Sequence, residues 1–138
     1  PVNRKKMIEK RARKIDTVRD DLPKGWRWGN AKATIGLLGF GSAGPILERA
    51  ALRLAEAETD VQVLRPRTIW PVLDETIDFI RQCERVYVIE YNEAGQLAHT
   101  ISGAGAPKEK MISVLKYDGT PFRAVDIANT VLKREASE

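Results

Sequence analysis

The sequence predicts an α/β fold with three layers, an open sheet of mostly parallel strands covered by helices on both faces. From Ala33 onward, short β-rich apolar runs alternate with segments of helical period. The runs are continuously apolar, as expected for parallel strands that are buried on both faces. A turn containing glycine or proline follows each of these runs, and a segment of helical period comes after the turn. Such alternation indicates right-handed strand–helix–strand crossovers.

The first segment predicts a basic amphipathic helix. Residues 1–30 hold ten Lys and Arg against four Asp and Glu, whereas the other 108 residues hold thirteen against fifteen. One helical face carries apolar residues at steps of three and four: Ile8, Ala12, Ile15, Val18 and Leu22. We expect this face to dock on a surface while the Lys and Arg side chains stay in water. No aromatic residues interleave with the basic ones, so binding of nucleic acid is the less favoured interpretation.

Asp20–Gly25 should end this helix, and the residues up to Asn30, with Trp26 and Trp28, are expected to form a linker. The sequence thus divides into an N-terminal helix and linker, residues 1–30, and one α/β domain, residues 31–138.

The remaining elements follow in a regular order. The strand candidates are Thr34–Phe40, Val61–Leu64, Val86–Glu90 and Ile112–Leu115. Two helices should start at prolines, Pro45 and Pro71. A short helix is expected over Gln96–Ile101, and Thr120 should cap a last helix with Pro121 just inside it. Sites in such sheets form beyond the carboxyl ends of the strands. Those ends are Gly39–Gly44, Arg65–Trp70, Glu90–Gln96 and Lys116–Thr120.

The segment Gly39–Gly44 matches G-x-G-x-x-G between a strand and a helix, the pattern that binds the pyrophosphate of a dinucleotide. However, the acidic residue for the ribose is missing where the second strand ends, at Leu64–Arg67, because Asp60 precedes that strand. Pro45 also removes an amide that the phosphate would use. Arg65 and Arg67 could instead bind the 2′-phosphate of NADP, so that cofactor is not excluded. We favour a tight turn that needs glycine, with a small dinucleotide-binding module as the alternative.

Other candidate residues carry weaker signals. His99 has no partner for a catalytic triad, and Cys83 is in step with Ile80, so it should be a small buried residue. Trp70 is most simply a packing anchor. Glu90 ends a strand at the expected functional edge, either as a hydrogen-bonding or ion-pairing residue or as a member of a site.

The composition and the motifs exclude several functions. One cysteine and one histidine exclude an internal disulfide framework and a cysteine cage for zinc or iron–sulfur clusters. The longest apolar stretch has eight residues, against about 20 for a membrane span, and no signal sequence opens the chain, so we expect a cytoplasmic protein. Because the chain starts at Pro1, we expect a piece of a longer protein. It lacks the Gly-Asp-Gly…Asn motif for thiamine diphosphate, so we predict no catalytic residue, no metal and no cofactor bound by this chain alone.

Four segments together resemble a known family: Leu38–Ser42, Leu64–Pro71, Val88–Leu97 and Leu115–Phe122. They are similar to the C-terminal domain of the alpha subunit of 2-oxoacid:ferredoxin oxidoreductases, a domain like the C-terminal domain of transketolase. The resemblance covers residues 33–133. The Glu-x-Asn-x-x-Gly-Gln-Leu stretch that begins at Glu90 is more similar to the 2-oxoglutarate or broad-specificity branch than to the pyruvate branch.

The resemblance implies a parent enzyme that oxidatively decarboxylates a 2-oxoacid with coenzyme A and passes electrons through iron–sulfur clusters to ferredoxin. Its thiamine diphosphate and magnesium would lie between a pyrimidine-binding domain of the alpha subunit and the beta subunit. The present chain would be a non-catalytic domain that packs against both. The resemblance also implies a mixed sheet of about five strands, with the fifth at Gly25–Asn30 or near Thr68.

The loops at the carboxyl edge are therefore the candidate site, as an interface. The candidate residues are Gly39, Phe40, Gly41, Ser42, Glu90, Tyr91, Asn92, Gly95 and Gln96. We expect Gly39–Ser42 and Asn92–Gln96 to lie side by side, because both follow parallel strands. Phe40, Tyr91 and Gln96 offer apolar area with hydrogen-bonding tips, which favours a protein interface over a cofactor pocket.

Overall fold

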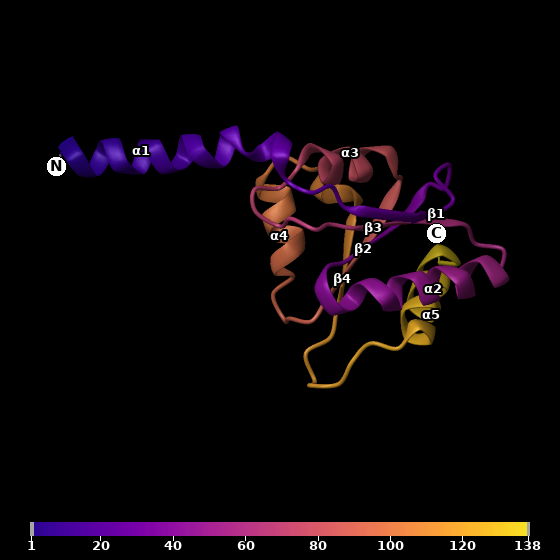
Figure 1. The fold of residues 1–138 in the computed structure, drawn as a ribbon. Helices are drawn as coiled ribbons and strands as arrows, with labels where there is room; N and C mark the ends of the chain where they lie inside the picture. Colours follow the sequence, from indigo (N-terminus) through magenta and orange to yellow (C-terminus); the bar gives the residue numbers. More distant parts are fainter. Residues whose placement is uncertain (1, 138) are drawn as a thin grey trace.

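Three layers and one projecting helix make up the computed structural model of the chain, which describes residues 2–137 (Figure 1). Pro1 and Glu138 lie outside the described residues. The helices are α1 (Val2–Thr17), α2 (Gly44–Glu56), α3 (Asp74–Gln82), α4 (Gln96–Gly103) and α5 (Ala124–Glu135). The strands are β1 (Trp26–Gly29), β2 (Ile35–Leu38), β3 (Val61–Arg65), β4 (Arg85–Glu90) and β5 (Met111–Leu115). Short 3-10 turns lie at Arg19–Asp21, Gly41–Ala43 and Lys108–Lys110.

The five strands form one sheet in the order β1-β3-β2-β4-β5. The last four strands of the chain run parallel to one another, and β1 pairs antiparallel with β3. This confirms the predicted α/β class and places the fifth strand in Gly25–Asn30, one of its two expected positions. The stretch expected as a linker is thus an edge strand, in which Trp26 lies opposite Arg65.

The core fills both faces of the sheet. One cluster joins α2 and α5 to the strands through residues such as Leu47, Ile127 and Leu37. The other joins α3 and α4 to the opposite face through residues such as Phe79, Ile101 and Val88. These contacts bury the central strands on both sides, which explains their continuously apolar sequences.

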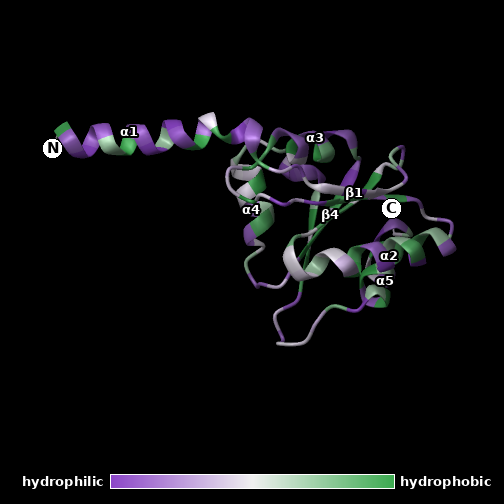
Figure 2. Cartoon of the chain, in the orientation of Figure 1, coloured by the Kyte–Doolittle hydropathy of each residue, from purple (hydrophilic) through white to green (hydrophobic). Residues whose placement is uncertain are grey.

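Helix α1 projects away from this body, and none of its residues is buried (Figures 1 and 2). Ile8 is 57% exposed and Ile15 39%, so the expected docking of the apolar face has no counterpart within residues 2–137. The helix also ends earlier than expected, at Thr17, and a 3-10 turn follows. Arg19 fixes the junction to the body, because its Nη1 donates to the carbonyl of Val72 at 2.8 Å.

The last helix begins later than the sequence indicated. Instead of capping it, Thr120 donates its amide and its hydroxyl to Asp118 Oδ1 at 2.9 and 2.8 Å. The Asp118 side chain thereby forms a local turn that competes with helix formation. Helix α5 starts only at Ala124, where the guanidinium of Arg123 pairs with Asp126 at 2.8 Å.

Candidate functional site

The carboxyl ends of the parallel strands bring the predicted loops together. Strands β2 and β4 are neighbours in register, with Leu38 opposite Val88, so the loops that follow them leave the same edge. This confirms the parallel pairing on which that expectation depended. The backbones are close there, because a Cβ added at Gly39 would lie 3.1 Å from the carbonyl oxygen of Ile89.

Exposed aromatic side chains gather along this edge, which we call the aromatic edge. Phe40, Tyr91 and Tyr117 lie just beyond β2, β4 and β5, and Trp70 lies in the segment that follows β3. Because β1 runs antiparallel, its first residue reaches the same edge opposite the end of β3. The exposed aromatic residues of the described chain are Trp26, Phe40, Trp70, Tyr91 and Tyr117. Four of them therefore adjoin one edge of the sheet, and Trp70 lies in the connection from β3 to α3.

The glycine motif has a structural explanation at each of its positions. Gly41 has φ +59°, a left-handed conformation that favours glycine, and open space where a Cβ would be. Gly39 is closely packed, and a Cβ at Gly44 would overlap Cδ and Nε of Arg65. The side chain of Arg65 thus lies over the start of α2, where the pyrophosphate of a dinucleotide would sit. The dinucleotide alternative is therefore not favoured.

Glu90 is a buried hydrogen-bonding residue, with 1% of its surface exposed. Its carboxylate accepts hydrogen bonds from the amides of Leu97 at 2.6 Å and Ala98 at 3.1 Å. The side-chain amide of Asn92 donates a third, at 2.9 Å. The negative charge at the first turn of α4 also suits the positive end of the helix dipole. Glu90 and Asn92 therefore fix the loop that follows β4, together with Gly95 in its left-handed conformation (φ 63°).

Tyr91 connects two of the loops. Its hydroxyl accepts a hydrogen bond from the amide of Phe122 at 2.9 Å, and the two rings lie 5.1 Å apart. We expected the Tyr91 hydroxyl to form hydrogen bonds across an interface, but it is bonded within the chain. Only the exposed part of the Tyr91 ring is therefore available for contact with another protein. Ser42 and Gln96 are exposed at the same edge.

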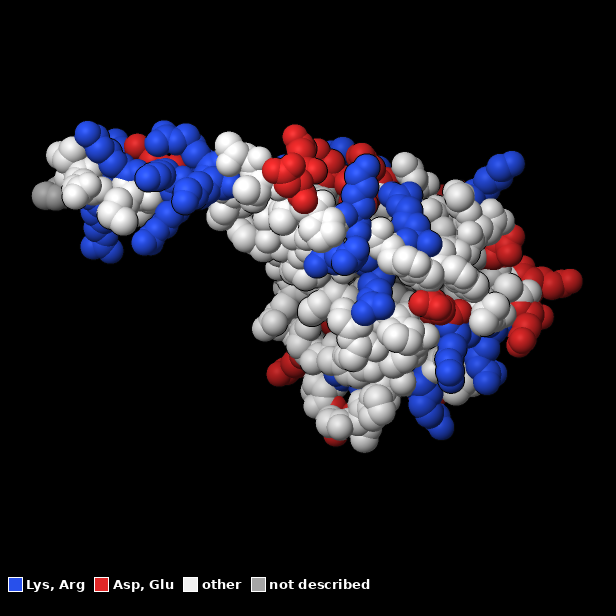
Figure 3. All heavy atoms as spheres, in the orientation of Figure 1, with Lys and Arg blue, Asp and Glu red and all other residues white. Residues whose placement is uncertain are grey.

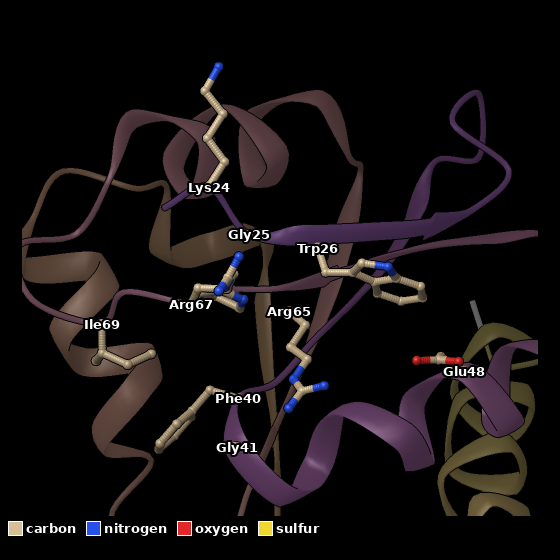
Figure 4. Close-up of a pocket in the computed structure, with 10 residues that line it drawn as sticks. Lys24, Gly25, Trp26, Phe40, Gly41, Glu48, Arg65, Arg67 and Ile69 are labelled. Carbon is tan, nitrogen blue, oxygen red and sulfur yellow. The ribbon is translucent and has the colours of Figure 1, made fainter. Parts of the chain in front are cut away.

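Two hollows flank the turn between β2 and α2. The first, which we call the basic hollow, measures about 720 Å³, and its lining includes Trp26, Phe40, Glu48, Arg65 and Arg67. Figure 4 shows the two guanidinium groups between Trp26 and Phe40, whereas the ammonium of Lys24 points away from them. Sequence reasoning missed Trp26 and Lys24 here, because β1 was expected as a linker.

The second hollow, of about 680 Å³, lies on the other side of the turn and is lined by residues that include Ser42, Tyr91 and Tyr117. At its rim, Lys116 Nζ pairs with Asp118 Oδ2 at 2.9 Å. The hydrogen bond from Lys116, with those from Thr120, holds the pKa of the Asp118 carboxyl well below its usual range. Asp118 is therefore a charged structural residue of this loop at neutral pH.

Comparison with known proteins connects this fold to one enzyme family. No protein-family model matches the chain. It is 28% identical over 136 residues to the alpha subunit of 2-oxoacid:ferredoxin oxidoreductase 2 of Aeropyrum pernix. A solved 2-oxoglutarate:ferredoxin oxidoreductase of Magnetococcus marinus, with 2-oxoglutarate, coenzyme A and succinyl-CoA bound, matches with a TM-score of 0.85 and 29% identity. The chain is homologous to part of a 2-oxoacid:ferredoxin oxidoreductase alpha subunit. This confirms the resemblance seen in the sequence.

Further relatives agree with this homology to 2-oxoacid:ferredoxin oxidoreductases. The chain is 26% identical over 132 residues to subunit KorA of the 2-oxoglutarate synthase of Methanocaldococcus jannaschii. The alpha chain of a probable 2-oxoacid ferredoxin oxidoreductase from Thermoplasma acidophilum shares the fold, with a TM-score of 0.51 and 20% identity, over 80% of this chain and 96% of that one.

The chain spans only a fraction of the longer relatives. The matches cover 95% and 96% of this chain but 21% of the Aeropyrum subunit and 35% of KorA. The Magnetococcus match covers 96% of this chain and 23% of the solved one. The chain is thus equivalent to one small domain of a much larger oxidoreductase subunit.

The described residues of this domain offer no cluster of ligands that fits the magnesium ion that such an enzyme would use. Among residues 2–137, no three His, Cys, Asp or Glu side chains come together as metal ligands. Arg65 covers the start of α2. Burial raises the pKa of the Cys83 thiol to about 11, so this cysteine is not a nucleophile at neutral pH. No helix among the described residues is long and apolar enough to cross a membrane.

Proposed function

We propose that the chain is a non-catalytic domain of the alpha subunit of a 2-oxoacid:ferredoxin oxidoreductase, and that its aromatic edge packs against the rest of the enzyme. The main support is that four of the five exposed aromatic residues of the described chain, Trp26, Phe40, Tyr91 and Tyr117, adjoin the strand ends at this one edge. Exposed aromatic area concentrated in one place is typical of protein interfaces. A domain that forms a small part of a large subunit has neighbours to cover such an edge.

The parent reaction follows from the family. The complete enzyme would convert a 2-oxoacid and coenzyme A to carbon dioxide and an acyl-CoA, and the electrons released would reduce ferredoxin. Thiamine diphosphate, magnesium and iron–sulfur clusters would be held by other parts of the complex, because this sequence lacks the Gly-Asp-Gly…Asn motif and has a single cysteine. The partners would be the pyrimidine-binding domain of the same subunit and the beta subunit. The 2-oxoglutarate branch is supported by KorA and by the Magnetococcus enzyme, both named for 2-oxoglutarate.

The interface is tested with Phe40→Ala in the isolated chain and in the assembled enzyme. Phe40 is 43% exposed, so its removal should leave the melting temperature of the isolated chain nearly unchanged and weaken assembly. Leu52→Ala is the matched control, because Leu52 is 52% exposed on α2 and lies outside the aromatic edge. Size-exclusion chromatography of the complex and thermal unfolding of the chain give the two readouts. A large loss of domain stability with assembly intact would identify Phe40 as a core residue and refute the interface.

A further inference from the structure

Two arginine side chains in the basic hollow have no acidic partner among residues 2–137. The side chains of Arg65 and Arg67 make no hydrogen bond or ion pair with any residue of 2–137, although the backbone of Arg65 pairs with β1 in the sheet. Glu48 is the one carboxylate among the described residues that line the hollow, and it is not within ion-pair distance of either guanidinium. Figure 3 shows a group of blue spheres in the middle of the body, apart from those of α1.

The position of Arg65 is built into the fold. Its side chain lies against Gly44, and it fits there because glycine has no Cβ. The side chain is half-buried, at the end of strand β3, next to the exposed rings of Trp26 and Phe40. An arginine held in one place loses less conformational freedom when it binds an anion than a free surface arginine does. The hollow is therefore better organised for an anion than an ordinary basic surface.

We propose that the basic hollow binds carboxylate side chains from an acidic segment of the rest of the enzyme, a partner assignment that rests on the proposed function. A planar guanidinium pairs with a carboxylate through two parallel hydrogen bonds. The walls of the hollow are Trp26 and Phe40, so the site is continuous with the aromatic edge that is proposed to be covered. Arginine and tryptophan together are the residue types that dominate binding energy at protein interfaces.

Charge also decides between possible occupants. The basic helix α1 of a second copy would be repelled from this hollow. The side chain of Arg65 covers the backbone amides at the start of α2, so the phosphates of a nucleotide could not bind to them. The end of β3 also offers no acidic residue for the ribose. An acidic protein segment meets neither obstacle.

The test is a titration of the 138-residue chain with hexaglutamate at low salt, followed residue by residue by NMR. We expect the indole N–H of Trp26 and the amide of Gly41 to shift. In Arg65→Gln/Arg67→Gln the affinity read from these signals should fall about tenfold, as for the loss of two charge-assisted contacts. Arg49→Gln/Arg53→Gln is the matched control, with the same charge change on α2 outside the basic hollow. Signals of α1 report separately any binding to that helix.

Two further measurements sharpen the result. Gly44→Ala keeps both charges but displaces Arg65, so it should weaken hexaglutamate binding at Trp26 while the chain stays folded. Inorganic pyrophosphate is the second probe. If it shifts the same signals at lower concentration than hexaglutamate, the site is one for phosphate groups and the proposal is overturned. Unchanged signals, or equal losses in both double variants, overturn it too. In that case an assembly defect of Phe40→Ala would leave the proposed function standing, whereas a normal assembly would reject that function independently.

Discussion

Glu90 shows how one residue at a strand end can carry structure instead of chemistry. Its buried carboxylate accepts three hydrogen bonds, two of them from amides at the start of α4. The sequence placed it correctly at the carboxyl edge but left its role open. That role depends on amides seven and eight residues further along the chain, and no local pattern shows that they point back at the side chain.

We therefore expect Glu90→Gln to lower the free energy of unfolding by about 2–4 kcal/mol, since an amide offers one acceptor and places a donor against backbone N–H groups. Urea denaturation measures the difference. Glu93→Gln is the control, because Glu93 is exposed in the same loop. Equal stabilities of the two variants would contradict the structural role of Glu90.

Cys83 is a buried residue whose ionisation the fold opposes. Burial, partly offset by Lys110 and Arg27, raises the pKa of its thiol from 9.0 to about 11. Between pH 9 and 11 the unfolded chain loses this proton while the folded chain keeps it, so stability should fall as the pH rises. Below pH 9 this contribution is constant. In Cys83→Ala the decline should be smaller, and a thiol reagent at pH 8 should label the wild-type chain only after unfolding. Rapid labelling of the native chain would disprove the burial.

Among the helices and strands, the sequence predicts those that are determined by residues close together in the chain. Apolar runs mark four of the five strands, and Pro45 and Pro71 mark the region where α2 and α3 begin. Strand β1 is harder to recognise, because four residues at a sheet edge become a strand only through pairing with β3. The start of α5 was misplaced for a similar reason, since the turn made by Asp118 and Thr120 decides it.

Helix α1 should contribute little to the stability of the domain. It buries no residue, and Arg19 anchors the chain after the helix has ended. Deletion of residues 1–17 should therefore change the melting temperature by less than about 2 °C, given that 1 kcal/mol corresponds to roughly 3–5 °C in a domain of this size. Differential scanning calorimetry of the two forms measures this. A larger decrease would mean that α1 packs on the body in solution.

For the whole molecule, the candidate site was predictable where it depends on parallel strands. The loops after β2 and β4 were expected together, and their strands are neighbours. The sequence does not show that β1 contributes to this edge. The basic hollow depends on that strand, because the pairing of β1 with β3 brings Trp26 opposite Arg65. The interface thus joins loops that the chain order suggests with an edge strand that only tertiary pairing reveals.

We expect the isolated chain to fold on its own and to be catalytically inactive. Core clusters on both faces of the sheet should let the isolated chain unfold in one cooperative transition. At the carboxyl edge, Glu90 is held by hydrogen bonds to the start of α4, and Arg65 covers the start of α2. The purified chain should therefore reduce no ferredoxin when supplied with a 2-oxoacid, coenzyme A, thiamine diphosphate and magnesium. A complete 2-oxoacid:ferredoxin oxidoreductase in the same spectrophotometric assay is the positive control. Any ferredoxin reduction above background by the folded chain would show that this domain carries catalytic groups of its own.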